Sequence, residues 1–149
     1  MAQVSSTTNC YWSRDKRGHL RLISDTAVND SDKTLTVPAG AVWEVMWAYA
    51  SFATSADVGN RLMTLEAGDG TSVIGVAKPY QVQAASGTEY YNWGMYGAAS
   101  ESPATFHFIP LPAFFLPAGY TLRFYDSAAI AAAADDLLVY MLVAEYPAG

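Results

Sequence analysis

The sequence predicts an all-β fold, a jelly-roll-like antiparallel β-sandwich, for residues 34–149. Two observations predict it. From Thr34 onwards, short apolar segments alternate with glycine, proline and aspartate, and helical periodicity is nearly absent. A tight-turn sequence also occurs twice, about 80 residues apart, as expected where related turns recur in the two halves of a jelly roll.

The recurring turn is Pro-Ala-Gly. Segments 35–45 and 114–124 align without gaps around glycines at positions 40 and 119. Proline presets φ at the first turn position, and glycine accepts the left-handed conformation at the third. We therefore expect positive φ at Gly40 and Gly119, with a strand on each side. The alternative is that Pro-Ala-Gly is only a common turn sequence.

The longest expected strand is 41–53, which is apolar on both faces and is therefore expected to be central or covered by another subunit. Simple alternation places Trp43, Val45, Trp47 and Tyr49 on one face. The residues expected in the core are Trp43, Val45, Trp47, Leu122 and Phe124. The candidate strands are 34–37, 41–53, 61–67, 72–77, 80–84, 89–96, 105–109, 114–116, 120–125 and 137–146.

Two connections have their own signals. Gly68-Asp69-Gly70 lies between two apolar segments and indicates a hairpin, because glycine reaches the positive φ that tight hairpin loops need. Segment 127–136, SAAIAAAADD, is rich in helix formers and begins with a serine that can cap a helix. We expect a helix of one or two turns in this loop.

The amino-acid composition limits the classes of partner that the protein can bind. Charged residues make up 15% of the 149 residues, against about 25% in an ordinary soluble domain, which favours a surface partly covered by a partner. The net charge of −6 disfavours nucleic acid and anionic membranes as ligands. Neither a signal peptide nor a membrane-length apolar run is present, so we expect synthesis in the cytoplasm.

No set of residues indicates catalysis or metal binding. The single cysteine, Cys10, has no partner for a disulfide, and the two histidines, His19 and His107, lie outside any nucleophile or zinc signature. The acidic pairs in 30–32 and 135–136 are typical of solvated turns or helix ends. We therefore expect a protein that is not an enzyme and has no cofactor and no metal.

One cluster has the composition of a sugar-binding surface. Alternation in segment 89–96 places Tyr90, Asn92 and Tyr96 on one face of a strand and Tyr91 and Trp93 on the other. Aromatic faces beside amide groups suit stacking and hydrogen bonding to carbohydrate. The competing interpretation, which we favour, is a core stripe on one side and a half-exposed face on the other.

Residues 1–33 are polar and carry more than half of the basic side chains. We expect them to form an extended N-terminal arm that orders against a neighbouring subunit or another partner. The alternative is that 11–23 forms a first strand of the sandwich, with Leu20 and Leu22 facing its core. The residues expected to contact the partner are Tyr11, Trp12, Arg14, Lys16, Arg17 and Arg21.

Four segments together carry a family resemblance: VPAGAVWEVMWAYASF, TSADVGNRLMTLEAGDG, LPAGYTLRFYDSAAIAAAADD and LLVYMLVAEY. They resemble a widespread group of small structural proteins of tailed bacteriophages, encoded among head and tail genes. The similarity covers residues 34–146 and rests on the Pro-Ala-Gly turns and on segments 58–61 (VGNR) and 125–128 (YDSA). It implies a jelly-roll virion protein of the kind that decorates or cements capsids.

The function expected from this resemblance is a capsid decoration protein. It would bind the major capsid protein on the outside of the head and be located in the virion, as a homo-oligomer with a trimer preferred over a dimer. The alternatives are a tail, collar or fibre-associated subunit, and a carbohydrate-binding module for host attachment.

Overall fold

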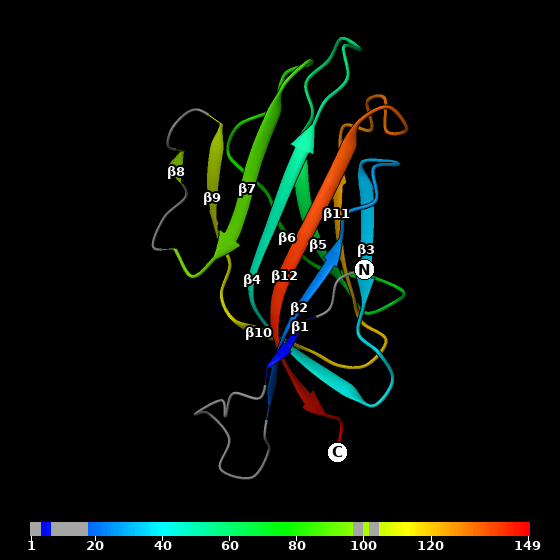
Figure 1. The fold of residues 1–149 in the computed structure, drawn as a ribbon, viewed down its shortest axis with the longest axis vertical. Coiled ribbons are helices and arrows are strands. Elements are labelled where there is room, and N and C mark those ends of the chain that lie inside the picture. The colour runs from blue at the N-terminus through cyan, green and yellow to red at the C-terminus, as the bar shows by residue number, and fades with distance from the viewer. Residues whose placement is uncertain (1–3, 7–17, 97–99, 102–104) are drawn as a thin grey trace.

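The computed structural model describes residues 4–6, 18–96, 100–101 and 105–149. Within them the chain forms two packed β-sheets and no helix (Figure 1). The strands are β1 Val4–Ser6, β2 His19–Asp25, β3 Asp32–Thr36, β4 Ala41–Ala53, β5 Met63–Gly68, β6 Val73–Ala77, β7 Thr88–Gly94, β8 Ser100–Glu101, β9 Phe106–Pro110, β10 Phe114–Leu116, β11 Thr121–Asp126 and β12 Asp136–Pro147.

The strand order is that of a jelly roll. The large sheet has the order β1-β2-β12-β4-β7-β9-β8, with β10 paired to β4, and the small sheet has the order β3-β11-β5-β6. Each sheet thus interleaves strands from the beginning and the end of the chain, as two Greek keys require. The expected fold class is confirmed, with one exception to antiparallel pairing: β7 and β9 are parallel.

Both Pro-Ala-Gly turns move the chain from one sheet to the other. The first joins β3 of the small sheet to β4 of the large sheet, and the second joins β10 of the large sheet to β11 of the small sheet. Gly40 has φ 79° and Gly119 has φ 84°, which confirms the expected conformation.

The two turns also contact each other. Val37, just before the first turn, donates its N–H to the Tyr120 carbonyl at 2.9 Å and accepts the Gly119 N–H at 3.0 Å. Since β3 pairs with β11 and β4 pairs with β10, the two copies lie side by side and run in opposite directions.

The core contains most of the residues expected there. Trp43, Val45, Leu122 and Phe124 are all at most 3% exposed. Trp47 is only half-buried, and its prediction is wrong for a local reason. On β12, Val143 lies opposite Val45 and the next residue, Leu142, lies opposite Trp47.

Met46 therefore has no partner on β12 and forms a β-bulge, which inserts one residue and inverts the alternation that follows. Beyond the bulge, Ala48, Ala50 and Phe52 are completely buried, while Trp47 and Tyr49 turn outward. The two alanines lie opposite Trp93 and Tyr91 of β7, so small side chains on one strand leave room for large buried rings on the next.

The β5–β6 hairpin forms as expected. Gly70 has φ 90°, and the Asp69 carboxylate accepts the backbone N–H groups of Thr71 and Ser72 at 2.8 and 2.7 Å.

The helix expected over 127–136 is absent. Ala129 and Ala131 have φ 54° and 48°, values that a right-handed helix cannot contain, so the segment is a series of turns.

The predicted boundary at residue 33 also requires correction. Residues 19–25 form β2, which pairs with β12 inside the large sheet, and β3 begins at Asp32. Leu20 and Leu22 lie opposite Ala144 and Leu142, and Ile23 is the β2 residue that joins the core. Residues 18–33 belong to the sandwich. The segment buries few apolar side chains, but the backbone hydrogen bonds between β2 and β12 hold it in the sheet.

The turn glycines provide a clean test of backbone strain. An added Cβ at Gly40 or Gly119 meets no atom of the described residues within 4 Å, so a substitution there changes only the conformational energy. We expect Gly40→Val and Gly119→Val each to lower the free energy of unfolding by about 1–2 kcal/mol. Urea denaturation measures the change. Gly75→Val, at an equally open position without positive φ, is the matched control; equal losses in all three variants would contradict the turn assignment.

Candidate functional site

The outer surface of the large sheet carries a continuous set of aromatic and uncharged side chains. In one row across the sheet, Tyr140, Tyr49, Asn92 and Phe108 lie opposite one another on four neighbouring strands. In the adjacent row, Leu138, Ser51, Tyr90 and Phe106 do the same. We call this surface the aromatic face, defined as Trp47, Tyr49, Ser51, Tyr90, Asn92, Phe106, Phe108, Leu138, Tyr140 and Leu142, all half-buried.

The rings on this face stack against one another. Tyr90 and Phe106, which are register partners, have ring centroids 4.7 Å apart and planes inclined by 24°. This separation equals the spacing of neighbouring strands, so the rings project from the sheet side by side. On the other side of Tyr90, the Tyr49 ring lies at 6.3 Å and 15°. Neighbouring rings therefore flank Tyr90 on both sides.

Tyr49 is at the centre of the cluster. Its ring also contacts Trp47 at 5.9 Å and Tyr140 at 6.0 Å. Burial raises the pKa of Tyr49, and the nearby phenol groups of Tyr90 and Tyr140 raise it further. The Tyr49 hydroxyl is consequently neutral over the physiological range and adds no charge to this cluster.

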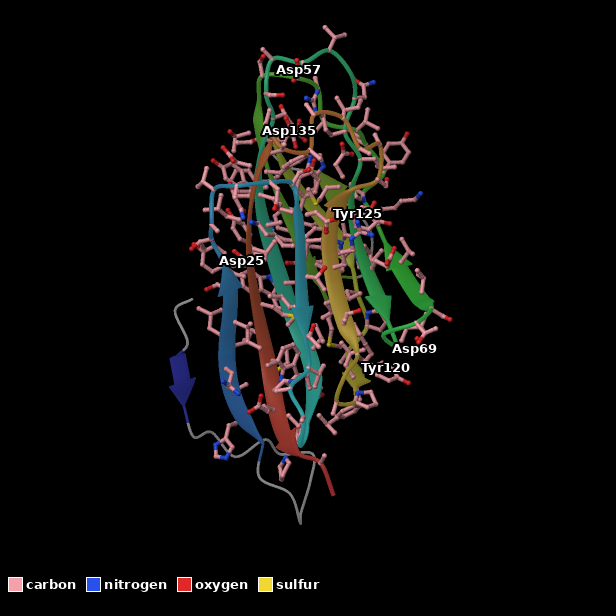
Figure 2. All side chains as sticks on the ribbon, turned by 90° about the vertical axis from the view of Figure 1, so that its right-hand side faces the viewer. Asp25, Asp57, Asp69, Tyr120, Tyr125 and Asp135 are labelled. Carbon is pink, nitrogen blue, oxygen red and sulfur yellow. The ribbon has the colours of Figure 1, made fainter. Side chains whose placement is uncertain are left out.

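The outer surface of the small sheet has a different character. Arg123 forms an ion pair with Asp32 and lies 4.1 Å from the centroid of the Tyr125 ring. The Tyr125 hydroxyl donates to Glu66 at 2.8 Å. Figure 2 shows Tyr125 projecting from this sheet. Covering this surface would remove charges from water, which is costly, whereas the aromatic face carries no charge.

The sequence identified part of the aromatic face. Tyr90 and Asn92 lie on it, as strand alternation predicted, and Tyr91 and Trp93 are buried on the opposite side. Tyr96, which follows β7, packs edge-on against Phe108 at 5.4 Å and 77°. Trp47 and Tyr49 were missed because the bulge at Met46 reverses their orientation. The remaining aromatic and leucine members lie on β9 and β12, and the alternation of side chains along these two strands was the signal that could have identified them.

A buried polar chain lies directly beneath one end of this face. The His107 ring stacks on Tyr91 at 4.7 Å, and its Nε2 lies 2.5 Å from Glu89 Oε2. The Tyr91 hydroxyl donates to Gln83 Oε1 at 3.0 Å. Gln83 in turn donates to the Phe52 carbonyl at 2.9 Å. His107 is therefore an inward-facing structural residue, on the opposite side of β9 from Phe106 and Phe108, as its alternation predicted.

A second buried network holds the loops at one end of the sandwich. Arg61 is completely buried and donates to both carboxylate oxygens of Asp135, at 2.8 and 3.2 Å. It also donates to the carbonyls of Asp57 and Gly59, each at 2.7 Å, and to Ser55 Oγ at 3.1 Å. One guanidinium thus connects the β4–β5 loop to the β11–β12 loop. Figure 2 shows Asp57 and Asp135 at the same end of the sandwich.

Asp135 differs from the solvated turn residue that the sequence predicted. It is 0% exposed and accepts the Ser55 backbone N–H at 2.7 Å in addition to Arg61. Burial alone would raise the pKa of Asp135, but the hydrogen bonds from Arg61 and Ser55 and the Arg61 charge outweigh it and lower the pKa.

Asp126 closes the same loop from its other side. Its carboxylate accepts backbone N–H groups from Leu62, Ala128 and Ile130, at 2.7, 2.9 and 3.1 Å. The VGNR and YDSA segments that carry the family resemblance therefore contain Arg61 and Asp126, two residues that fix the loop structure. Asp135, the partner of Arg61, was not identifiable from local sequence, because it is 74 residues away.

The residues expected in a partner-binding arm are only partly described. Arg21 lies in β2 and binds Glu145 of its own chain, at 2.5 and 2.6 Å. Glu145 also accepts the Trp43 indole N–H at 2.8 Å. The prediction that Arg21 meets a partner's acidic group is corrected accordingly. The other expected arm residues, Tyr11, Trp12, Arg14, Lys16 and Arg17, lie outside the described residues.

The described ranges contain no group of three or more His, Cys, Asp or Glu side chains arranged to hold a metal ion. The same ranges contain no helix long and apolar enough to cross a membrane.

Comparisons with known proteins gave no family assignment. No family model and no curated protein matches the chain. Among solved structures, it is similar to the CBM22-1–GH10 modules of Clostridium thermocellum endo-1,4-beta-D-xylanase 10B, with 14% identity and a TM-score of 0.30, over 99% of this chain and 25% of that one. It is also similar to infectious bursal disease virus Gx strain, with 11% identity and a TM-score of 0.34, over 98% of this chain and 42% of that one. Likenesses this distant carry no functional conclusion.

The Arg61–Asp135 pair is expected to dominate the stability of the loop end. Removing one charge leaves the other buried and unpaired, so Asp135→Asn should lower the free energy of unfolding by about 3–5 kcal/mol. Because the pKa of Asp135 is lowered in the folded state, its contribution is present above the unfolded value of about 3.9 and is lost as the pH falls through the folded value.

Denaturant unfolding between pH 7 and pH 2 measures both effects. The stability of Asp135→Asn should depend less on pH in the acidic range than that of the wild type. Asp57→Asn is the matched control, because it removes the same charge from an exposed carboxylate in the same network of loops. Equal destabilisation by the two variants would contradict the assigned role of the buried pair.

Proposed function

We propose that this chain is a structural protein of a phage virion, which decorates the outside of the head and attaches through its aromatic face. The single observation that carries this proposal is the aromatic face, a continuous set of uncharged side chains across β12, β4, β7 and β9. The resemblance of residues 34–146 to small structural proteins of tailed phages supplies the kind of partner, the major capsid protein.

The charge distribution supports attachment by this side of the sandwich. Docking on a partner removes water from the covered side chains, and unpaired charges make that removal costly. On the small sheet, docking would remove water from the Asp32–Arg123 ion pair and from the Glu66 carboxylate. On the aromatic face, ring edges and phenol hydroxyls can be covered at low cost, and the hydroxyls can form hydrogen bonds with the partner.

The size of the face favours an oligomer. Four strands at about 4.8 Å spacing and five residues at about 3.4 Å each project an area of about 300–350 Å². A stable interface needs about 800 Å² on each partner. One face alone would therefore bind weakly, whereas a homotrimer that presents three faces to neighbouring capsid subunits gains avidity without further contacts. We include this trimer in the proposal.

The ring arrangement favours a protein partner over a carbohydrate. Sugars bind aromatic residues by stacking on an open ring face. At Tyr90, the rings of Tyr49 and Phe106 lie on the two sides at 6.3 and 4.7 Å. These neighbours restrict the access of a sugar to the ring faces on which it would stack.

A charge placed at the centre of the aromatic face tests the proposal. Ser51 lies between Leu138 and Tyr90 in register, and a lysine there would extend over the face. We expect Ser51→Lys to reduce binding to undecorated heads by at least about tenfold, because the ammonium group would lose its water on docking. Cosedimentation of purified protein with heads assembled without it measures the binding.

The matched control is Thr34→Lys, which adds the same charge at an exposed position of β3 on the opposite sheet. It should bind heads like the wild type. Equal binding by both variants would refute attachment through the aromatic face. Binding of the wild type to purified tails and not to heads would favour a tail or collar subunit, and binding to a glycan array would favour host attachment.

A further inference from the structure

β6 lies at the edge of the small sheet and exposes an apolar surface. Val73, Ile74 and Val76 are 56%, 53% and 55% exposed. The strand contains no charged residue. In Figure 2 the β5–β6 hairpin lies at the margin of the molecule, next to Asp69. An edge strand also has backbone N–H and C=O groups that no neighbouring strand satisfies.

An apolar groove runs beside this edge. It has a volume of 390 Å³ and lies between β6 and segment 110–114, with Leu65 and Leu122 of the small sheet in its lining. All of its lining residues are aliphatic, aromatic, proline or glycine. The groove therefore reaches core residues from the edge of the small sheet at β6.

An open strand edge beside such a groove is the arrangement that binds an added strand. Main-chain hydrogen bonds attach the incoming segment to the edge, and its alternate side chains enter the groove. All pairs within the small sheet are antiparallel, so an added strand continues the sheet in the same way if it runs antiparallel to β6.

The side chains of β6 argue against a second copy of this strand as the occupant of the groove. Gly75 and Ala77 of β6 line the groove and lie opposite Ala67 and Leu65. A copy of β6 would bring the same two small side chains to this part of the groove, beside Ile74 and Val76, which line the rest of it, and would leave the space next to Gly75 unfilled. The register shift beside Ile74 and the proline at position 79, just after the strand, also limit pairing to a short stretch.

Charges at the two ends of β6 define the occupant further. Exposed Asp69 lies in the turn before the strand, and exposed Lys78 directly follows it. We propose that the edge of β6 and its groove bind one short extended segment of a partner protein, antiparallel to β6. That segment has bulky apolar side chains at alternate positions, an acidic residue at its N-terminal end and a basic residue at its C-terminal end.

A synthetic peptide tests this proposal without virions, so its result is independent of the proposed function. The probe is acetyl-Glu-Thr-Leu-Thr-Leu-Thr-Lys-amide, and the control is the reversed sequence, which has the same composition and places each charge beside a like charge. Isothermal titration calorimetry measures affinity, and hydrogen exchange locates the bound segment. We expect saturable binding below millimolar concentration, slower exchange of the β6 amides, and binding of the reversed peptide at least about tenfold weaker.

A variant that fills the groove distinguishes binding at this site from nonspecific binding of the peptide. An added Cβ at Gly75 meets no described atom within 4 Å and the position has no positive φ, so Gly75→Leu should fold and place its side chain in the groove. We expect it to weaken peptide binding at least about tenfold with an unchanged or higher melting temperature. Gly87→Leu, at an equally open glycine away from β6, should bind like the wild type.

Three results would overturn the proposal. The first is no binding of the probe to the wild type up to millimolar peptide. The second is equal binding by Gly75→Leu and the wild type. The third is self-association of the wild type that Gly75→Leu abolishes, which would make a second copy the occupant.

Discussion

The β-bulge at Met46 is the constraint on which the outer surface of the large sheet depends. It inserts one residue into β4 where that strand changes its neighbour from β10 to β7. Without it, Trp47 and Tyr49 would face the core and Ala48 would face outward. The bulge sends two large rings to the surface and two alanines inward, where they accommodate Trp93 and Tyr91. One unpaired residue thus organises both the core and the aromatic face.

The two sheets consequently have different roles. The outer surface of the small sheet carries an ion pair, a cation–π contact and a hydrogen bond to a carboxylate. These groups are already paired while they face water. On the large sheet the aromatic face presents stacked rings without charge, and the buried Arg61–Asp135 pair holds the loops at one end of the sandwich in one arrangement. A rigid sandwich with an uncharged face on one sheet suits the proposed attachment, because little ordering entropy is lost when a rigid protein docks.

Much of the fold was predictable from local chemistry, and the rest depends on contacts between distant residues. The Pro-Ala-Gly turns fixed Gly40 and Gly119, and alternation placed Tyr90 and Tyr91 on opposite sides of β7. Alternation failed at Trp47 because no local signal marks a bulge whose cause is the register with β12. Helix propensity failed at 127–136 because Asp126 binds backbone N–H groups in turns instead. Asp135 was misjudged because its partner, Arg61, is remote in sequence.

In the proposed attachment, the aromatic face is the surface that the head covers. Hydroxyl-radical footprinting of the head-bound protein tests it directly, because tyrosines occur on several sides of the molecule. Oxidation of Tyr49, Tyr90 and Tyr140 should fall on binding, while that of Tyr125 on the small sheet and of Tyr80, which is 90% exposed, should not change. Protection of Tyr125 or Tyr80, with the three face tyrosines unchanged, would contradict the claim.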